Sequence, residues 1–100
     1  MLKICTQEEI KKVKKRFPRW EINAHSMQRT WEFEKFSQAM AFIVQVGFCA
    51  EHVQHHPRIT NSYCLVQIQL TTHDVGNQLT HLDVKLAELI EGIVKTSETG

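Results

Sequence analysis

Apolar and polar positions recur along the chain with two different periods, and these periods predict seven structured segments. Apolar residues recur every three or four positions in residues 7–17, 36–54 and 81–93, which is the spacing of amphipathic helices. Alternation typical of half-buried strands occurs at Trp20 and Ile22, at Trp31 and Phe33, and from Tyr63 to Thr72, while residues 58–62 fit either a short strand or a loop. The order α-β-β-α-β-β-α predicts an α+β fold with helices packed on one face of an antiparallel sheet.

Local signals mark several boundaries of these segments. Thr6 and Glu9 have the spacing of a capping box at the start of the first helix, and Thr80 and Asp83 repeat it before the last helix. The polar residues 25–30 separate the first two strands, and we expect them to connect a hairpin although neither glycine nor proline marks its turn.

The central helix is apolar on more than one face. Its main stripe consists of Phe36, Ala39, Met40, Ile43, Val46, Gly47, Ala50 and Val53. Further apolar residues lie on its other faces: Ala41, Phe42, Val44, Phe48 and Cys49. A chain of 100 residues has too little other protein to cover such a helix, so we predict a homo-oligomer that buries it between subunits.

Composition narrows the class of protein. The chain has 12 basic and 11 acidic residues and a formal net charge of +1, which does not favour direct nucleic-acid binding. One hundred residues suit a single domain over 1–100. Three scattered cysteines predict no disulfide framework, and the longest uncharged run, residues 36–50, is shorter than the roughly 20 residues of a membrane helix. We therefore expect a cytoplasmic protein without a membrane segment.

Histidines cluster at the end of the central helix. His52, His55 and His56 lie there, Pro57 stops the helix, and His73 closes the long strand. Imidazole can donate or accept a proton near neutral pH, so this group could supply paired acid and base steps. A metal site and histidines without a role are the alternatives, although the spacing matches no standard zinc motif.

The histidines belong to a longer pattern. It combines an acidic residue, two adjacent histidines, a proline, an aromatic residue and a strand that ends in Thr-His: Glu51, His55, His56, Pro57, Tyr63, Thr72 and His73. In these positions the sequence closely resembles the family of pterin-4a-carbinolamine dehydratases, also known as the dimerisation cofactor of a hepatocyte transcription factor. The resemblance covers nearly the whole chain and includes Trp20, Trp31, Phe33, residues 36–42 and residues 79–83.

The resemblance implies a fold and an activity. It implies a four-stranded antiparallel sheet with helices on one face, assembled as a homodimer or homotetramer through helices. The implied enzyme is a hydro-lyase that dehydrates 4a-hydroxytetrahydrobiopterin to quinonoid dihydrobiopterin and so recycles the pterin cofactor of aromatic amino acid hydroxylases. It implies no metal and no cofactor.

The same resemblance assigns the candidate site residues. His55 and His73 become the acid and base, and His56 binds or polarises the substrate. The proposed substrate-binding residues are Glu51, Pro57, Thr72 and Asp83. Glu51 precedes His55 by one helical turn and could orient it, whereas a capping role alone would account for Asp83.

The sequence departs from the family at Ile59 and at Cys64, which stands where the family commonly has an asparagine after the tyrosine, and it leaves a second function open. Ile59 stands where the family often has a tryptophan two residues after the proline. The alternative function is a protein-binding scaffold without catalysis, because the resemblance also includes a transcription coactivator and an assembly chaperone of the carbon-fixing carboxylase. Three converging histidines favour the enzyme, since a scaffold has no chemical need for them.

Overall fold

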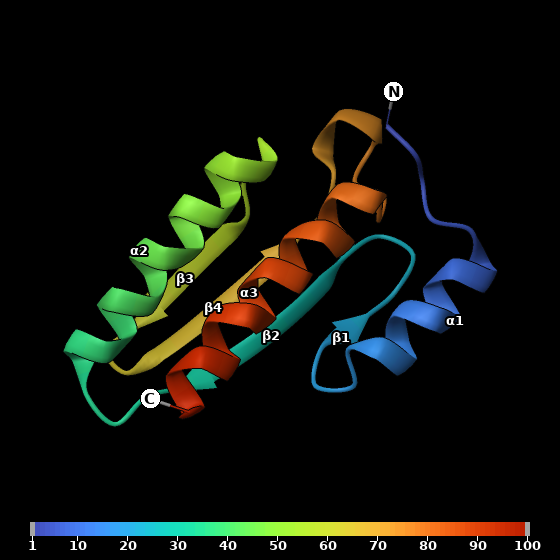
Figure 1. The fold of residues 1–100 in the computed structure, drawn as a ribbon. Coiled ribbons are helices and arrows are strands. Elements are labelled where there is room, and N and C mark those ends of the chain that lie inside the picture. Colours follow the sequence, from blue (N-terminus) through green and yellow to red (C-terminus); the bar gives the residue numbers. More distant parts are fainter. Residues whose placement is uncertain (1, 100) are drawn as a thin grey trace.

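A computed structural model of the chain describes residues 2–99, and the side chains of residues 2–93. Its elements follow the predicted order and are α1 (Gln7–Arg16), β1 (Glu21–Ile22), β2 (Met27–Glu32), α2 (Phe36–Val53), β3 (Arg58–Ser62), β4 (Leu65–Leu70), the 3-10 turn η1 (His73–Val75) and α3 (His81–Thr99). Figure 1 shows α2 and α3 lying side by side over one face of the sheet, with α1 beyond its β1 edge. The predicted α+β fold is confirmed.

The sheet is antiparallel throughout, in the order β1-β2-β4-β3. The predicted alternation of the long strand is confirmed, because Val66, Ile68 and Leu70 are fully buried beneath the helices. Gln67 and Gln69 alternate with them and therefore point to the opposite face of the sheet. The neighbours of Gln69 across the sheet, Arg58 and Gln28, share that face.

The core lies between this sheet and the helices. The buried apolar residues come from every layer and include Phe17, Trp20, Met27, Trp31, Phe42, Val46, Leu79, Leu86 and Ile90. Trp31 packs edge-on against Trp20 with 5.6 Å between ring centroids. Arg29 approaches the Glu91 carboxylate to 2.5 Å, and 9% of the Arg29 side chain is exposed. The core therefore joins the sheet to all three helices.

The hairpin between β1 and β2 is confirmed, but its second strand begins earlier than predicted. Residues 27–30, expected in the connection, form the first part of β2, and Met27 is fully buried opposite Leu70. The turn occupies residues 23–26 instead. The Asn23 side chain accepts hydrogen bonds from the backbone N–H groups of His25 and Ser26, so an asparagine makes this turn without glycine.

The central helix also differs in detail from the prediction. Phe42, expected outside the main stripe, is buried, whereas Phe36 is 45% exposed. The helix ends at Val53, four residues before Pro57, because Gln54 adopts a left-handed conformation with φ of 58°. The two adjacent histidines therefore lie in the segment that leaves the helix. No helix in the described part of the chain is long and apolar enough to cross a membrane.

Candidate functional site

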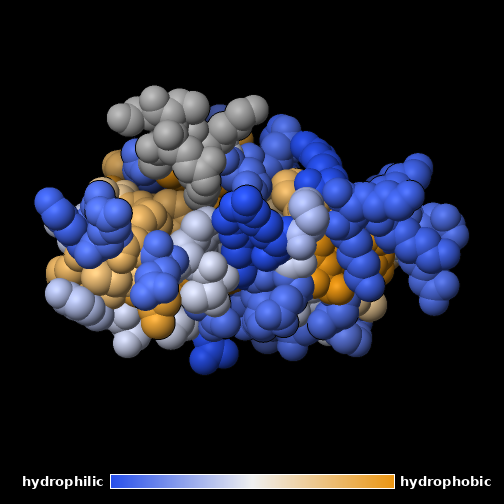
Figure 2. Space-filling model, turned by 90° about the horizontal axis from the view of Figure 1, so that it is seen from below, coloured by the Kyte–Doolittle hydropathy of each residue, from blue (hydrophilic) through white to orange (hydrophobic). Residues whose placement is uncertain are grey.

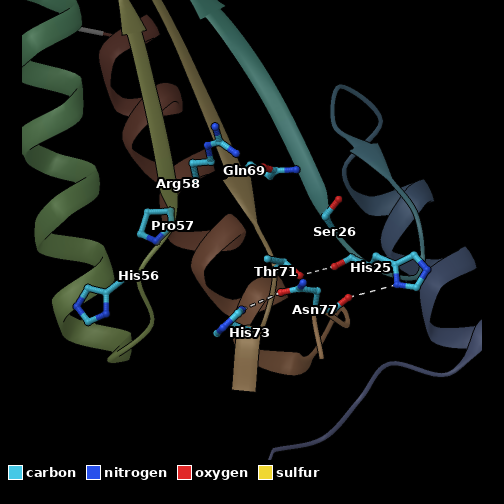
Figure 3. A pocket seen from close by; sticks show the side chains of 9 residues that line it. All are labelled: His25, Ser26, His56, Pro57, Arg58, Gln69, Thr71, His73 and Asn77. Carbon is cyan, nitrogen blue, oxygen red and sulfur yellow. Dashed lines mark hydrogen bonds between the residues drawn. The ribbon is translucent and has the colours of Figure 1, made fainter. Parts of the chain in front are cut away.

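A hollow of about 490 Å³ opens at the end of the sheet where β4 ends and β2 and β3 begin. Nine residues line it: His25, Ser26, His56, Pro57, Arg58, Gln69, Thr71, His73 and Asn77 (Figure 3). They come from the strands β3 and β4 and from the segments after α2, after β4 and before β2, so the sheet brings together residues far apart in the sequence. Three of the nine are histidines.

A buried carboxylate holds one of the predicted histidines beside this hollow. His55 Nε2 lies 2.5 Å from Asp83 Oδ1, and 11% of the His55 side chain and none of the Asp83 side chain is exposed. A carboxylate can only accept here, so the His55 proton sits on Nε2. The second carboxylate oxygen accepts from Thr72 Oγ1 and from the backbone N–H of Thr80, at 2.9 Å each. The Asp83 carboxylate therefore joins the segment after α2, the end of β4 and the start of α3.

Thr72 and Thr80 complete the network around this carboxylate. Both side chains are buried, and their hydroxyl oxygens lie 2.6 Å apart. Because the Thr72 hydroxyl donates to Asp83, the Thr80 hydroxyl must donate to Thr72. The Thr80 oxygen in turn accepts from the backbone N–H of Leu82 at 3.2 Å. The predicted capping pair at the start of α3 is thus part of a larger buried network.

The second predicted histidine lies in the hollow itself and has an exposed partner. His56 Nε2 lies 3.0 Å from Glu51 Oε1, and both side chains are 70% exposed. The sequence suggested that Glu51 would orient His55, one helical turn away. That expectation is wrong, because the chain leaves the helix at Gln54 and turns His56 toward Glu51 while His55 turns inward to Asp83.

The third predicted histidine lies across the hollow from His56 (Figure 3). His73 begins η1, and its Nδ1 lies 3.1 Å from the Asn77 amide oxygen. Since that oxygen only accepts, the His73 proton sits on Nδ1 and Nε2 remains the basic nitrogen. Gly76 and Asn77 both adopt positive φ, which turns the chain back so that Asn77 can reach His73.

Other residues that line the hollow were not predicted from the sequence. His25 looked incidental, but its Nδ1 donates to the backbone oxygen of Asn77 at 3.2 Å. Its own backbone oxygen accepts from the Thr71 hydroxyl at 2.6 Å. The hairpin is thereby tied to the end of β4. No local motif marks His25, whereas Thr71 and Arg58 could have been found by extending the alternation of their strands to the polar face.

The predicted site residues therefore fall into two connected groups. His56, Pro57 and His73 line the hollow. The buried group consists of His55, Thr72 and Asp83, and Glu51 contacts the first group through His56. Within the described residues, no three histidine, cysteine or acidic side chains are arranged to hold a metal ion. The arrangement instead offers several imidazoles and amides around a space open to a small molecule.

Comparison with known proteins identifies the family. The family model described as "Pterin 4 alpha carbinolamine dehydratase" matches residues 3–93. This chain belongs to the pterin-4a-carbinolamine dehydratase family. A Synechococcus sp. (strain WH7803) relative named "Putative pterin-4-alpha-carbinolamine dehydratase" is 41% identical over 93 residues, which are 93% of this chain and 99% of the relative. The family resemblance drawn from the histidine pattern is thus confirmed.

Solved structures show that the pterin-4a-carbinolamine dehydratase fold serves proteins with different names. A transcriptional coactivator/pterin dehydratase from Brucella melitensis superposes with a TM-score of 0.82 at 31% identity, covering 89% of this chain and 96% of that one. A pterin dehydratase-like RuBisCO assembly factor of the alpha-carboxysome superposes with a TM-score of 0.58 at 19% identity, covering 74% and 84%. The second likeness concerns the fold alone.

Where this dehydratase-family member departs from the family pattern, the structure gives a local reason. Ile59 is paired with Ile68 on β4 and packs against the core. Its side chain therefore does not line the hollow, and the preceding residue, Arg58, does so instead. Within this family member the polar character of the hollow comes from Arg58, Gln69 and Thr71 on the face of the sheet that the helices leave open.

Proposed function

We propose that this chain is a hydro-lyase that removes water from a 4a-hydroxytetrahydropterin to give the quinonoid dihydropterin. One observation carries the proposal: His56 and His73 line the same hollow from opposite sides, with His55 beside them on a buried carboxylate. The family to which the chain belongs supports the choice of a pterin as the substrate. We include tetrahydrobiopterin recycling for aromatic amino acid hydroxylases in the proposal.

The reaction needs one proton given and one proton taken. The hydroxyl on C4a leaves as water once an imidazolium has protonated it, and the C4a–O bond breaks. The neighbouring ring nitrogen loses its proton to a neutral imidazole while its electron pair forms the new C=N bond. The protons given and taken balance, so the protein needs no metal, oxidant or reductant for this step. Positioned imidazoles suit such transfers because they titrate near neutral pH.

We assign proton transfer to His73 and His55 and substrate contact to His56. His73 Nδ1 is held by Asn77, which leaves Nε2 to meet the substrate. His55 Nε2 is held by Asp83, which leaves Nδ1 for proton transfer and stabilises the ring when it becomes charged. His56 is 70% exposed and contacts Glu51, which fits a group that binds the pterin ring. Pro57 and Thr72 hold these segments in place.

The test follows formation of the quinonoid product from freshly generated 4a-hydroxytetrahydropterin, above the rate in buffer. Wild type should accelerate the reaction, and His55→Ala and His73→Ala should each lower kcat at least about 100-fold. His56→Ala should mainly raise KM. His52→Ala is the matched control, because His52 is exposed on α2 and does not line the hollow. A folded wild-type protein without activity would refute the proposal.

We also propose that the chain forms a homodimer or homotetramer through α2. Apolar side chains remain exposed along this helix, with Val44 57% and Phe48 73% exposed. Phe36 stacks on Tyr63 at the start of the helix, and both rings are exposed. Figure 2 shows apolar residues gathered at this end of the molecule, whereas the α1 end is mostly hydrophilic around a smaller apolar patch. Covering such a surface with a second copy removes it from water.

The alternative function is a protein-binding scaffold on the same fold. It is favoured by the same exposed face of α2 and by the similarity to the Brucella melitensis protein, which is described as a transcriptional coactivator/pterin dehydratase. The two roles use different surfaces, because α2 contributes none of the nine residues that line the hollow. A scaffold without catalysis would show wild-type activity no higher than that of the His55→Ala and His73→Ala variants.

A further inference from the structure

The charge of the hollow exceeds what the proposed proton transfers require. Among its nine lining residues are one arginine, three histidines and five uncharged residues, and none is a carboxylic acid. Arginine is always protonated at physiological pH, so Arg58 gives the hollow a permanent positive charge. Among the described side chains, Glu51 is an acidic residue bonded to a lining residue, and one of its carboxylate oxygens lies 3.0 Å from His56 Nε2.

Arg58 is also unusual among the arginines of this chain. Arg16 and Arg29 each form an ion pair with a glutamate on α3, at 2.9 and 2.5 Å. No acidic side chain among residues 2–93, whose side chains the structure describes, pairs with Arg58. The guanidinium of Arg58 is therefore available to an anion that enters the hollow.

The neighbours of Arg58 suit an anion as well. Arg58 begins β3 and is paired with Gln69 on β4, so both side chains project from the same face of the sheet. Figure 3 shows them next to each other along one side of the hollow, on the opposite side from His73 and Asn77. The guanidinium offers a planar pair of N–H donors and the Gln69 amide can add a third. This donor set matches the oxygens of a carboxylate or a phosphate.

The size of the hollow leaves room for such a group. Its volume of about 490 Å³ lies within the roughly 300–1,000 Å³ of small-molecule sites. A bicyclic pterin ring placed between His56 and His73 fills only one part. The remaining part, toward Arg58 and Gln69, can take a substituent of the ring.

We propose that Arg58 and Gln69 form a subsite for an anionic group, a carboxylate or a phosphate ester, on the side chain of the pterin. The inference rests on the proposed function, because it takes the pterin ring to lie between His56 and His73. The inference adds that the preferred substrate is a tetrahydropterin with an acidic side chain. The preference for this negative charge comes from Arg58 on the edge strand β3.

The experiment compares three oxidised pterins with the same ring, which bind without reacting: 6-hydroxymethylpterin, its phosphate ester and pterin-6-carboxylate. Their affinities are measured by quenching of pterin fluorescence or by calorimetry at low and high salt. Wild type should bind an anionic probe about fivefold more tightly than the neutral one, the size expected of one accessible ion pair. High salt should reduce this preference. The two anionic probes distinguish phosphate from carboxylate.

Variants assign the preference to its residue. Arg58→Gln should bind the neutral probe as wild type does and lose the preference for the anions, and Arg58→Glu should reverse it. Arg19→Gln is the matched control, because Arg19 is also exposed and unpaired within residues 2–93 but lies outside the hollow. Equal binding of all three probes by wild type, or a preference that survives in Arg58→Gln, overturns the subsite.

The outcome for the subsite can be separated from that for the reaction. Dehydration without charge preference overturns the subsite and leaves the proposed activity intact. A preference that depends on Arg58, in a protein without dehydratase activity, supports the anion subsite and overturns the reaction. Failure of wild type to bind any of the three pterins overturns the subsite, and if the same protein also fails to dehydrate the 4a-hydroxytetrahydropterin the reaction is overturned as well.

Discussion

Replacing Asp83 with asparagine removes a negative charge from a fully buried position while keeping the size of the side chain. The Asp83 carboxylate accepts three hydrogen bonds, from His55 Nε2, Thr72 Oγ1 and the backbone N–H of Thr80. Asparagine has one acceptor oxygen in place of two, so its NH2 group must face either His55 or Thr72. The substitution therefore weakens all three contacts and places two donors against each other unless the histidine changes its tautomer.

The magnitude follows from the strength of these contacts. A hydrogen bond to a charged group contributes about 1.5–3 kcal/mol and a neutral one about 0.5–1.5 kcal/mol, so losing the charge costs about 1 kcal/mol per bond. Three bonds give about 3 kcal/mol, and relief from burying a charge offsets part of it. We expect Asp83→Asn to lower the free energy of unfolding by about 2 kcal/mol. For a domain of this size that is roughly 10 °C in Tm.

The assay is urea denaturation followed by fluorescence of the two buried tryptophans, Trp20 and Trp31, at one fixed protein concentration. Glu9→Gln is the matched control, because Glu9 holds the same position in the capping box of α1 but 39% of its side chain is exposed, whereas none of the Asp83 side chain is. Its transition should move much less than that of Asp83→Asn. If both variants unfold at the wild-type urea concentration, the buried network does not stabilise this end of the fold, and the reasoning is refuted.

Two further predictions concern the surface. Phe48→Asp should convert the oligomer into a monomer, because it places a charge in the exposed apolar face of α2. Light scattering coupled to gel filtration measures the mass, and a wild-type protein that is already a monomer would contradict the interface. The pKa of the Glu9 carboxyl is lowered below its ordinary value of 4.5, mainly by the backbone N–H of Thr6. The ionised Glu9 carboxylate therefore stabilises the folded state fully above pH 4.5. This contribution to the free energy of unfolding is lost as the pH falls through the lower pKa of the folded state. Glu9→Gln should flatten this loss in the urea midpoint measured against pH, and an unchanged slope would contradict the assignment.

The sequence predicted the order and type of the elements because their periods were long and regular. Apolar and glutamine residues alternate strictly from Val66 to Leu70, and the buried positions Val66, Ile68 and Leu70 are those that the alternation selected. Both predicted capping pairs also lie at helix starts, although at α3 the Thr80 hydroxyl accepts from the backbone N–H of Leu82 and only Asp83 bonds back to the Thr80 N–H. For α1 the Thr6 side chain and the Glu9 side chain each bond the other's backbone N–H. Signals of this kind depend on neighbouring residues, so one sequence suffices to find them.

The boundaries that failed depend on single backbone conformations. The turn between β1 and β2 uses the Asn23 side chain, which the search for glycine and proline overlooked. The end of α2 depends on the left-handed conformation of Gln54, a residue for which this conformation is uncommon. That one residue decides that His55 turns inward and His56 outward. The sequence therefore selected two of the three histidines that line the hollow, His56 and His73, but passed over His25 and paired Glu51 with His55 in place of His56.

The two capping boxes show most directly why local spacing cannot identify a functional residue. Glu9 and Asp83 stand in the same relation to the threonine that begins their helices. Glu9 remains partly exposed, and besides capping α1 its carboxylate lies 3.9 Å from the exposed Lys3 ammonium. Asp83 begins the helix that lies across the sheet, where Thr72 from the end of β4 and His55 from the end of α2 meet it. The same carboxylate thus caps α3, fixes the end of the sheet and sets the tautomer of His55. Its role in the site arises from what the fold packs against it, and a substitution there should disturb stability and proton transfer together.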